Sequence, residues 1–157
     1  MYHLFLNNRG KLLFNSHIKK LSLVKSLEED LEIKGNFNEL MQVFVNIINN
    51  AKDALKENVD SKQDRIIMIS TKKMKKNLLE VKICDSGGGI KKKHLDKVFE
   101  PYFTTKHKSV GTGIGLSMAY QIITKRHKQN IEVENENFEY DNRSYKGACF
   151  RLLFKAR

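Results

Sequence analysis

The sequence predicts an α+β domain in which helices cover one face of a mixed β-sheet. Residues 36–55 repeat apolar side chains at intervals of three and four, which is typical of an amphipathic helix. Shorter segments on both sides of it are rich in apolar residues that partly alternate with polar ones, as in half-buried strands. Six of the nine glycines fall in two clusters that border these elements. The 157 residues suffice for one domain with a core of its own.

The first half of the chain is dominated by the long helix. Two short strands, 20–27 and 31–34, are expected ahead of it. Asn36 is the expected N-cap, with Glu39 three residues later. The buried stripe of the helix comprises Leu40, Val43, Phe44, Ile47, Ile48, Ala51, Ala54 and Leu55. Its polar face follows the same spacing over about 20 residues, roughly 30 Å, and comprises Glu39, Gln42, Asn46, Asn50 and Asp53.

The second half completes the sheet and adds two shorter helices. The remaining strands are expected at 65–71, 78–84, 131–134 and 148–154. The strand at 78–84 leads directly into Asp85 and the first glycine cluster. Helices are expected at 91–99 and 114–125. The inward-facing residues predicted for the second of these are Ile114, Met118, Ala119, Ile122 and Ile123.

Composition excludes several classes of protein. No long uninterrupted apolar run and no basic segment leading into one is present, so we expect no membrane contact, no secretion and a cytoplasmic location. Cys84 and Cys149 lie in apolar, strand-like segments without a neighbouring cysteine or histidine, and we interpret both as core residues. The formal charge of +11 is spread over lysine runs without interleaved aromatic residues, so no nucleic-acid surface is expected.

Two glycine motifs carry the functional signal. In the first, Asp85 is followed by Gly87 and Gly89, which let the backbone approach a flat, hydrogen-bonding ligand. In the second, residues 111–116 place three alternate glycines at the start of a helix, where backbone N–H groups can meet phosphate. Either motif alone is weak, since an Asp-Gly pair often marks only a turn. Their order behind an asparagine-bearing helix makes them specific.

Four segments together resemble the sequence boxes of sensor histidine kinases. Residues 46–51, 85–90, 99–106 and 111–116 are similar to the asparagine, first glycine, phenylalanine and second glycine boxes, in that order. The form Phe-Glu-Pro-Tyr-Phe-Thr-Thr-Lys most resembles the nitrogen-regulation branch. The resemblance implies the Bergerat ATP-binding fold: a two-layer α/β sandwich with about five strands and three helices on one face. It makes 17–157 a catalytic and ATP-binding domain, and 1–16 a tail or truncated end.

The residue types suit ATP and Mg²⁺ on chemical grounds. Asp85 is an acceptor-only carboxylate that can receive the exocyclic amine of adenine. Asn50 offers a neutral amide oxygen to Mg²⁺, and Asn46, one turn earlier, is expected to reach the phosphates or the water shell of the ion. A lone helical asparagine is more often merely solvated. Lys106, with Lys108 as a second candidate, is expected to meet phosphate oxygens, and 100–111 is expected to form a mobile lid.

We therefore expect a histidine kinase whose catalytic residues are Asn46, Asn50 and Lys106 and whose metal ligand is Asn50. The expected nucleotide-binding residues are Asn46, Asn50, Asp53, Asp85, Gly87, Gly89, Ile90, Phe103, Thr104, Thr105, Lys106, Gly111, Thr112, Gly113, Ile114, Gly115 and Leu116. Asp53 replaces the lysine or arginine of many relatives, which argues against its direct contact with phosphate. Phe99, Tyr102 and Phe103 are open to a second interpretation, as simple core residues.

The expected partners follow from the resemblance. None of the five histidines has the surroundings of a phosphoacceptor motif, so the phosphate is expected to pass to a histidine of a separate phosphoacceptor and dimerisation domain, and then to a response regulator. One alternative is an anti-sigma-factor or switch-type serine kinase of the same fold. Another is a gyrase-like hydrolase. Asn46 argues against hydrolysis, because an amide cannot accept a proton from water at neutral pH.

Overall fold

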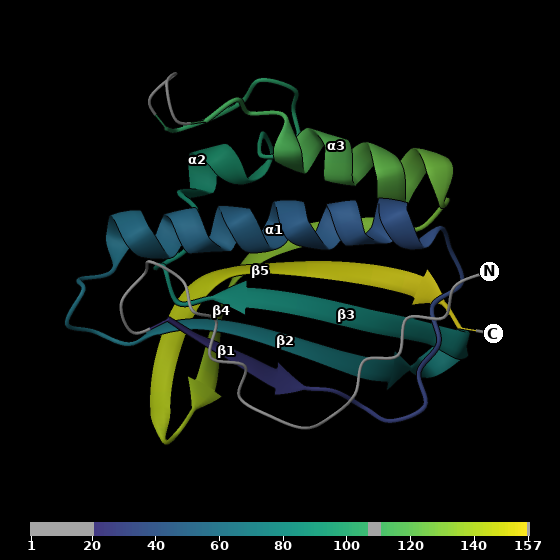
Figure 1. Ribbon diagram of the computed structural model, residues 1–157, viewed down its shortest axis with the longest axis horizontal. Coiled ribbons are helices and arrows are strands. Elements are labelled where there is room, and N and C mark those ends of the chain that lie inside the picture. Colours follow the sequence, from purple (N-terminus) through teal and green to yellow (C-terminus); the bar gives the residue numbers. More distant parts are fainter. Residues whose placement is uncertain (1–20, 107–110, 157) are drawn as a thin grey trace.

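A computed structural model describes residues 21–106 and 111–156 as two layers, a sheet and a set of helices on one of its faces (Figure 1). The strands are β1 (Leu21–Ser26), β2 (Arg65–Met74), β3 (Leu78–Asp85), β4 (Asn130–Tyr140) and β5 (Arg143–Lys155). The helices are α1 (Phe37–Asn58), α2 (Lys92–Leu95) and α3 (Gly115–Gln121), with the short helical turns η1 (Lys75–Asn77) and η2 (Ile122–Arg126). The strand order is β1-β2-β3-β5-β4. Only β1–β2 is parallel, so the predicted mixed sheet is confirmed.

Helix α1 begins where the sequence predicts. The Asn36 side chain accepts a hydrogen bond from the backbone N–H of Glu39 at 3.2 Å, which satisfies one of the free donors of the first turn. The Glu39 carboxylate does not return to the cap, as a capping box would require, because it binds Arg126 and His127 instead. The apolar stripe packs on the sheet, with its most buried members Leu40, Val43, Ile47, Ala51 and Leu55.

The strand predicted at 31–34 is wrong. These residues form no strand, and β1 is the edge of the sheet. Asp30 adopts a left-handed conformation (φ 56°), where the chain leaves the sheet for the helical layer. Ile33 is nevertheless buried and Leu31 packs against the core, so the apolar residues reflect burial without strand pairing.

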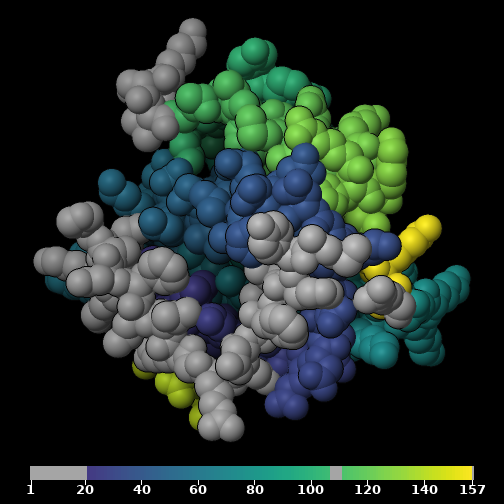
Figure 2. All heavy atoms as spheres, turned by 45° about the vertical axis from the view of Figure 1, so that its right-hand side comes forward, coloured from purple at the N-terminus to yellow at the C-terminus, as the bar shows by residue number. Residues whose placement is uncertain are grey.

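The two shorter helices differ from the prediction in length and in orientation. α2 has one turn instead of spanning 91–99. In α3 and η2, Ala119, Ile122 and Ile123 are buried as predicted, but Ile114 and Met118 are 39% and 42% exposed. The helix packs on the core through positions 116, 119, 122 and 123, which places 114 and 118 on the neighbouring, solvent-facing side. Figure 2 shows α3 lying directly on α1.

The last two strands are longer than predicted and form a hairpin. β4 and β5 pair from Asn130–Leu153 to Tyr140–Arg143. Asp141 and Asn142 make the turn, both with positive φ (51° and 58°), as a two-residue type I′ turn requires. Phe138 and Tyr145 stack across the two strands with ring centroids 5.7 Å apart.

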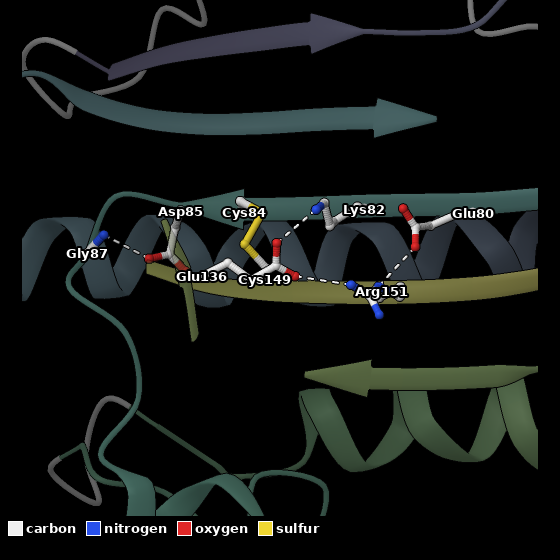
Figure 3. Close-up of a disulfide and its surroundings, with 8 residues drawn as sticks. All are labelled: Glu80, Lys82, Cys84, Asp85, Gly87, Glu136, Cys149 and Arg151. Carbon is white, nitrogen blue, oxygen red and sulfur yellow. Dashed lines mark hydrogen bonds and ion pairs between the residues drawn. A yellow bond between two sulfur atoms is a disulfide. The ribbon is translucent and has the colours of Figure 1, made fainter. Parts of the chain in front are cut away.

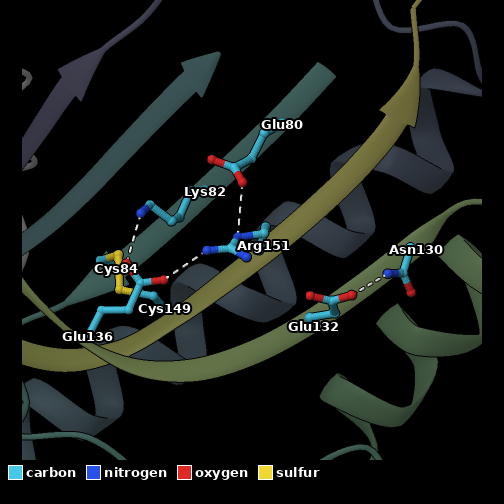
Figure 4. Close-up of polar contacts among 8 residues, drawn as sticks. All are labelled: Glu80, Lys82, Cys84, Asn130, Glu132, Glu136, Cys149 and Arg151. Atoms are coloured by element: carbon cyan, nitrogen blue, oxygen red, sulfur yellow. Dashed lines mark hydrogen bonds and ion pairs between the residues drawn. A yellow bond between two sulfur atoms is a disulfide. The ribbon is translucent and has the colours of Figure 1, made fainter. Parts of the chain in front are cut away.

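The face of the sheet opposite the helices carries charge pairs and a disulfide (Figure 4). Lys82 and Arg151 both pair with Glu136, at 2.8 and 3.3 Å. Arg151 Nε also lies 2.9 Å from Glu80, an ion pair without hydrogen-bond geometry. Cys84 and Cys149, buried as predicted, are joined in a disulfide between β3 and β5 that the sequence analysis did not predict.

No helix within 21–106 and 111–156 has the length and apolar character needed to cross a bilayer. Residues 1–16, predicted as a tail, lie outside the described residues, and the boundary at residue 17 stays a prediction.

Candidate functional site

Helix α1 brings together three motifs that are far apart in the sequence. The Asn46 side-chain amide donates to the carbonyl of Gly115 at 3.0 Å. Two turns further along the helix, Asp53 pairs with Lys106 at 2.5 Å. Next to it, Ala54 contacts the first glycine motif, since a Cβ added to Gly87 would lie 3.3 Å from Ala54. The predicted motifs therefore converge on one stretch of this helix.

Asp85 is the last residue of β3, and its carboxylate lies beside the Gly87 backbone (Figure 3). Its side chain is almost fully buried, with 2% of the residue exposed, and one carboxylate oxygen accepts the Gly87 N–H at 2.8 Å. Burial raises the pKa of Asp85 to about 6, although backbone hydrogen bonds from Gly87 and Ala148 act in the opposite direction. No cation among the described residues pairs with it. At neutral pH it is a buried anion that can accept a further hydrogen bond from a ligand.

Glycines near Asp85 are required by close packing at one position and by backbone conformation at another. A Cβ on Gly147 would lie 1.6 Å from the Asp85 carbonyl oxygen, so β5 can pass β3 this closely only with glycine at that position. Gly88 has a φ of +88° and donates its N–H to the Lys146 carbonyl at 2.9 Å. The loop thus departs from the end of β3 in one defined conformation.

Asn135 fixes the end of the first glycine motif, and the sequence analysis missed it. Its side-chain oxygen accepts the Ile90 N–H at 2.8 Å and its side-chain nitrogen donates to the Ile90 carbonyl at 2.7 Å. Gly89 lies so close that an added Cβ would be 2.6 Å from the Asn135 oxygen. An asparagine within a strand pattern gives no local signal for this role, because its partner is 45 residues away in the sequence.

The second glycine motif closes a loop with the phenylalanine motif. The Gly113 carbonyl accepts the Tyr102 N–H at 2.9 Å, and Gly113 has a φ of +66°. A Cβ at Gly113 would lie 2.5 Å from the Tyr102 carbonyl carbon. Gly111 packs in the same manner on Thr104 and the stem of Lys106. The two ends of the predicted lid are therefore joined, whereas Lys108 lies outside the described residues.

The aromatic residues of this region divide between core and surface. Phe99 packs edge-on against Phe150, with ring centroids 6.2 Å apart, and its ring is tilted against that of Tyr120 at 5.1 Å, so it packs against the core. Phe103 contacts the ring of His94 in α2 at 5.4 Å, which anchors the start of the predicted lid. Tyr102 is 77% exposed and is not a core residue.

The remaining predicted residues differ in their contacts. The amide of Asn50 is half-buried and makes no hydrogen bond within the described part of the chain, so its oxygen is free to bind a ligand. Asn46 is already engaged, because it also accepts from Gln42 at 2.9 Å. Thr105 and Thr112 are exposed, and Leu116 packs against the core. No three acidic, histidine or cysteine side chains of the described residues converge as a metal cluster, so an amide and water are the ligands this region offers to a divalent ion.

Comparisons with known proteins identify the family of the chain. A sequence profile described as histidine kinase-, DNA gyrase B- and HSP90-like ATPases matches residues 35–157. Sporulation kinase A of Bacillus subtilis is 34% identical over 130 residues, or 82% of this chain and 19% of that protein. The two-component sensor PprA of Pseudomonas aeruginosa is 35% identical over 91 residues, or 58% of this chain and 10% of that protein. The chain thus spans a fifth or less of these two relatives.

Among solved structures, the nucleotide-free catalytic domain of histidine kinase ThkA superposes with a TM-score of 0.66 at 27% sequence identity. The match covers 86% of this chain and 80% of that domain. The arrangement of sheet and helices described above is therefore that of a histidine kinase catalytic domain.

Proposed function

The chain belongs to the family of histidine kinase-, DNA gyrase B- and HSP90-like ATPases, and from this premise we propose that it is the ATP-binding catalytic domain of a sensor histidine kinase. The observation that carries the proposal is the convergence of both glycine motifs and Lys106 on α1 between Asn46 and Ala54, beside the buried Asp85. ATP would bind in this region and donate its γ-phosphoryl group.

Adenine recognition is assigned to Asp85 and the first glycine motif. A buried carboxylate without a cationic partner is unfavourable on its own, so an amine donor from the ligand compensates its lost hydration. Gly87 and Gly89 keep the approach free of side chains, and Ile90, held by Asn135, closes that side. This arrangement selects a base that presents an exocyclic amine.

The phosphates are assigned to the part of α1 between Asn46 and Asp53. Backbone N–H groups of 111–116 lie next to Asn46 through the bond to Gly115, and Lys106 lies on Asp53, two turns further along the helix. The unpaired Asn50 amide oxygen suits a hydrated Mg²⁺, which when bound would offset charge on the triphosphate. Asn50 is the proposed metal ligand, and Phe103, Thr104 and Thr105 complete the nucleotide-binding segment.

Transfer is favoured over hydrolysis by the side chains on α1. Asn46 is an amide that cannot activate water as a general base. Of the two carboxylates on the same face, Glu39 is engaged with Arg126 and His127, and Asp53 lies two turns away from Asn46. We therefore propose that a histidine of a phosphoacceptor domain takes the phosphoryl group, that a response regulator receives it next, and that the reaction takes place in the cytoplasm.

The test is to mix this chain with a separately made phosphoacceptor domain and labelled ATP. We expect acid-labile phosphate on the acceptor histidine, and little ATP hydrolysis by the chain alone. Asp85→Asn should abolish most labelling through lost ATP affinity, and Asn50→Ala should weaken its dependence on Mg²⁺. Acid-stable phosphoserine on a partner would favour the serine-kinase alternative, and rapid hydrolysis without an acceptor would contradict the proposal.

A further inference from the structure

We propose that Asp53 is a positioning residue that holds Lys106 in the nucleotide-free protein and gives it up to the phosphates when nucleotide binds. The inference rests on the proposed ATP site. It adds that Asp53 holds the Lys106 side chain in place there before nucleotide binds. It concerns an exchange of counter-ions on one lysine.

The contact itself is well defined. Lys106 Nζ lies 2.5 Å from an Asp53 carboxylate oxygen. The lysine side chain is only 17% exposed, whereas that of the aspartate is 47% exposed. The base of the lysine is fixed, because its N–H donates to Thr104 Oγ1 at 3.1 Å and Gly111 packs on its stem. The ammonium group at the far end can still move by rotation of the last side-chain bonds.

The position of the pair makes it relevant to phosphate. Asp53 lies three residues after Asn50 and seven after Asn46 on α1, so the three side chains occupy one face of the helix. Asn46 contacts Gly115 in the second glycine motif. A polyphosphate held between that motif and the amides would therefore lie near both members of the pair. It would attract the lysine and repel the aspartate, and both effects disfavour the pair.

The energetics permit the exchange. An ion pair whose carboxylate is about half-exposed contributes little, because water and salt screen it and two side chains must be held in one geometry. A triphosphate carries more charge than one carboxylate and can replace it as the lysine's partner. Asp53, already 47% exposed, can turn into solvent when the lysine leaves. Glu39, on the same face, has no such role because its partners Arg126 and His127 belong to the far end of α3 and η2.

The experiment is a double-mutant cycle of Asp53→Asn and Lys106→Gln in this chain, with affinities measured for ATP, ADP, AMP and adenosine in Mg²⁺. Asp53→Asn should tighten ATP binding about two- to fivefold, since the pair no longer has to break. The gain should shrink from ATP to AMP and vanish for adenosine. Lys106→Gln should weaken binding in the same order of ligands. In the Lys106→Gln background, Asp53→Asn should give a smaller gain.

A control uses an ion pair on the face of the sheet opposite the helices. Glu136 pairs there with Lys82 at 2.8 Å, so Glu136→Gln should leave all four affinities unchanged. The inference is overturned if Asp53→Asn weakens ATP binding, if it changes ATP and adenosine equally, or if its effect is the same with and without Lys106. If the unaltered chain binds none of the four ligands, the proposed function itself fails. Selective failure of the Asp53 variant leaves that function standing.

Discussion

Asp85 is the residue on which the proposed site depends most. A carboxylate this deeply buried without a cation costs stability in the free protein, and its pKa of about 6, against an ordinary 3.8, expresses that cost. The surrounding backbone is restricted as well, with glycine required at 147 and close packing at 87 and 89. A side chain that is kept buried and charged at such a cost in stability is typical of a ligand-binding site.

The raised pKa predicts how stability varies with pH. Between about pH 4 and 6 the folded protein holds the Asp85 proton while the unfolded chain has released it, so the free energy of unfolding falls as pH rises through this window. The loss should reach about 3 kcal/mol above pH 6. Asp85→Asn removes this contribution. Urea unfolding of both proteins from pH 4 to 7.5 should show the stability of the variant rising relative to that of the wild type up to about pH 6. Free energies of unfolding that vary with pH in the same way in both proteins would contradict the assignment.

The same residue predicts nucleotide affinity. Asp85→Asn at pH 7.5 replaces an acceptor-only group with one that presents a donor to the adenine amine, and should weaken ATP binding about 10- to 100-fold. Wild-type affinity should also fall below about pH 6, where the carboxyl becomes protonated. Calorimetric titration measures both. The variant is the control for protonation of the ATP phosphates, and an equal loss of affinity in both proteins below pH 6 would rule out Asp85 as the cause.

Asn135 should matter through the loop that it holds. Asn135→Ala removes both hydrogen bonds to Ile90 and leaves a backbone donor and acceptor unsatisfied, so we expect a loss of about 1–3 kcal/mol and weaker ATP binding. Asn135→Asp keeps the acceptor for the Ile90 N–H but loses the donor. Its stability and ATP affinity should therefore lie between those of the alanine variant and those of the unaltered chain. Thermal unfolding and ATP titration test this, and an unaltered affinity in the alanine variant would show that the loop does not need this support.

At the scale of elements, the stem of the predicted lid is the most constrained connection. Tyr102 and Gly113 join its ends by a hydrogen bond, and both have positive φ. Helix α3 then continues into the π-turn η2, where the His127 N–H reaches the carbonyl of Ile122. That turn delivers Arg126 and His127 to Glu39 at 2.7 and 2.8 Å. The start of α1 and the end of η2 are thereby tied together on the side of the sheet that carries the site.

Gly113→Ala should disturb this stem. A Cβ there meets the Tyr102 backbone at 2.5 Å in addition to the strain of a φ of +66°. Gly88→Ala is the matched control, because Gly88 also has a left-handed φ of +88° but nothing lies within 4 Å of an added Cβ. We expect Gly88→Ala to cost about 1 kcal/mol of stability from the backbone alone. Gly113→Ala should cost clearly more, as measured by thermal unfolding, and equal losses would contradict the close packing of the stem.

At the scale of the whole molecule, the Cys84–Cys149 disulfide links the central strand β3 to its neighbour β5, next to Asp85. The two cysteines are the only ones in the chain, so thiol labelling of the denatured, unreduced protein should detect no free thiol, and two after reduction. Reduction should lower stability by about 2–4 kcal/mol, because the bridge spans 65 residues of the unfolded chain. Two reactive thiols before reduction would contradict the bond. Cys84→Ser with Cys149→Ser is the control, since its stability should not respond to reductant.

Local sequence patterns determined much of the secondary structure of this protein and the location of its motifs. The N-cap at Asn36, the buried stripe of α1, strands β1, β2 and β3 and the two glycine motifs are encoded by neighbours within a few residues, so they can be identified without a partner. The order of those motifs was also enough to indicate the fold and the class of ligand.

Tertiary structure decided the features whose partners lie far along the chain. It paired Lys106 with Asp53, Asn135 with Ile90, Glu39 with Arg126 and His127, and Cys84 with Cys149, across separations of 45 to 88 residues. It also turned residues 31–34 out of the sheet and lengthened β4 and β5 into a hairpin. Periodicity shows that a side chain is apolar or polar at a given spacing. Only packing of the complete chain determines which group it meets, because burial and pairing are shared between segments that the sequence keeps apart.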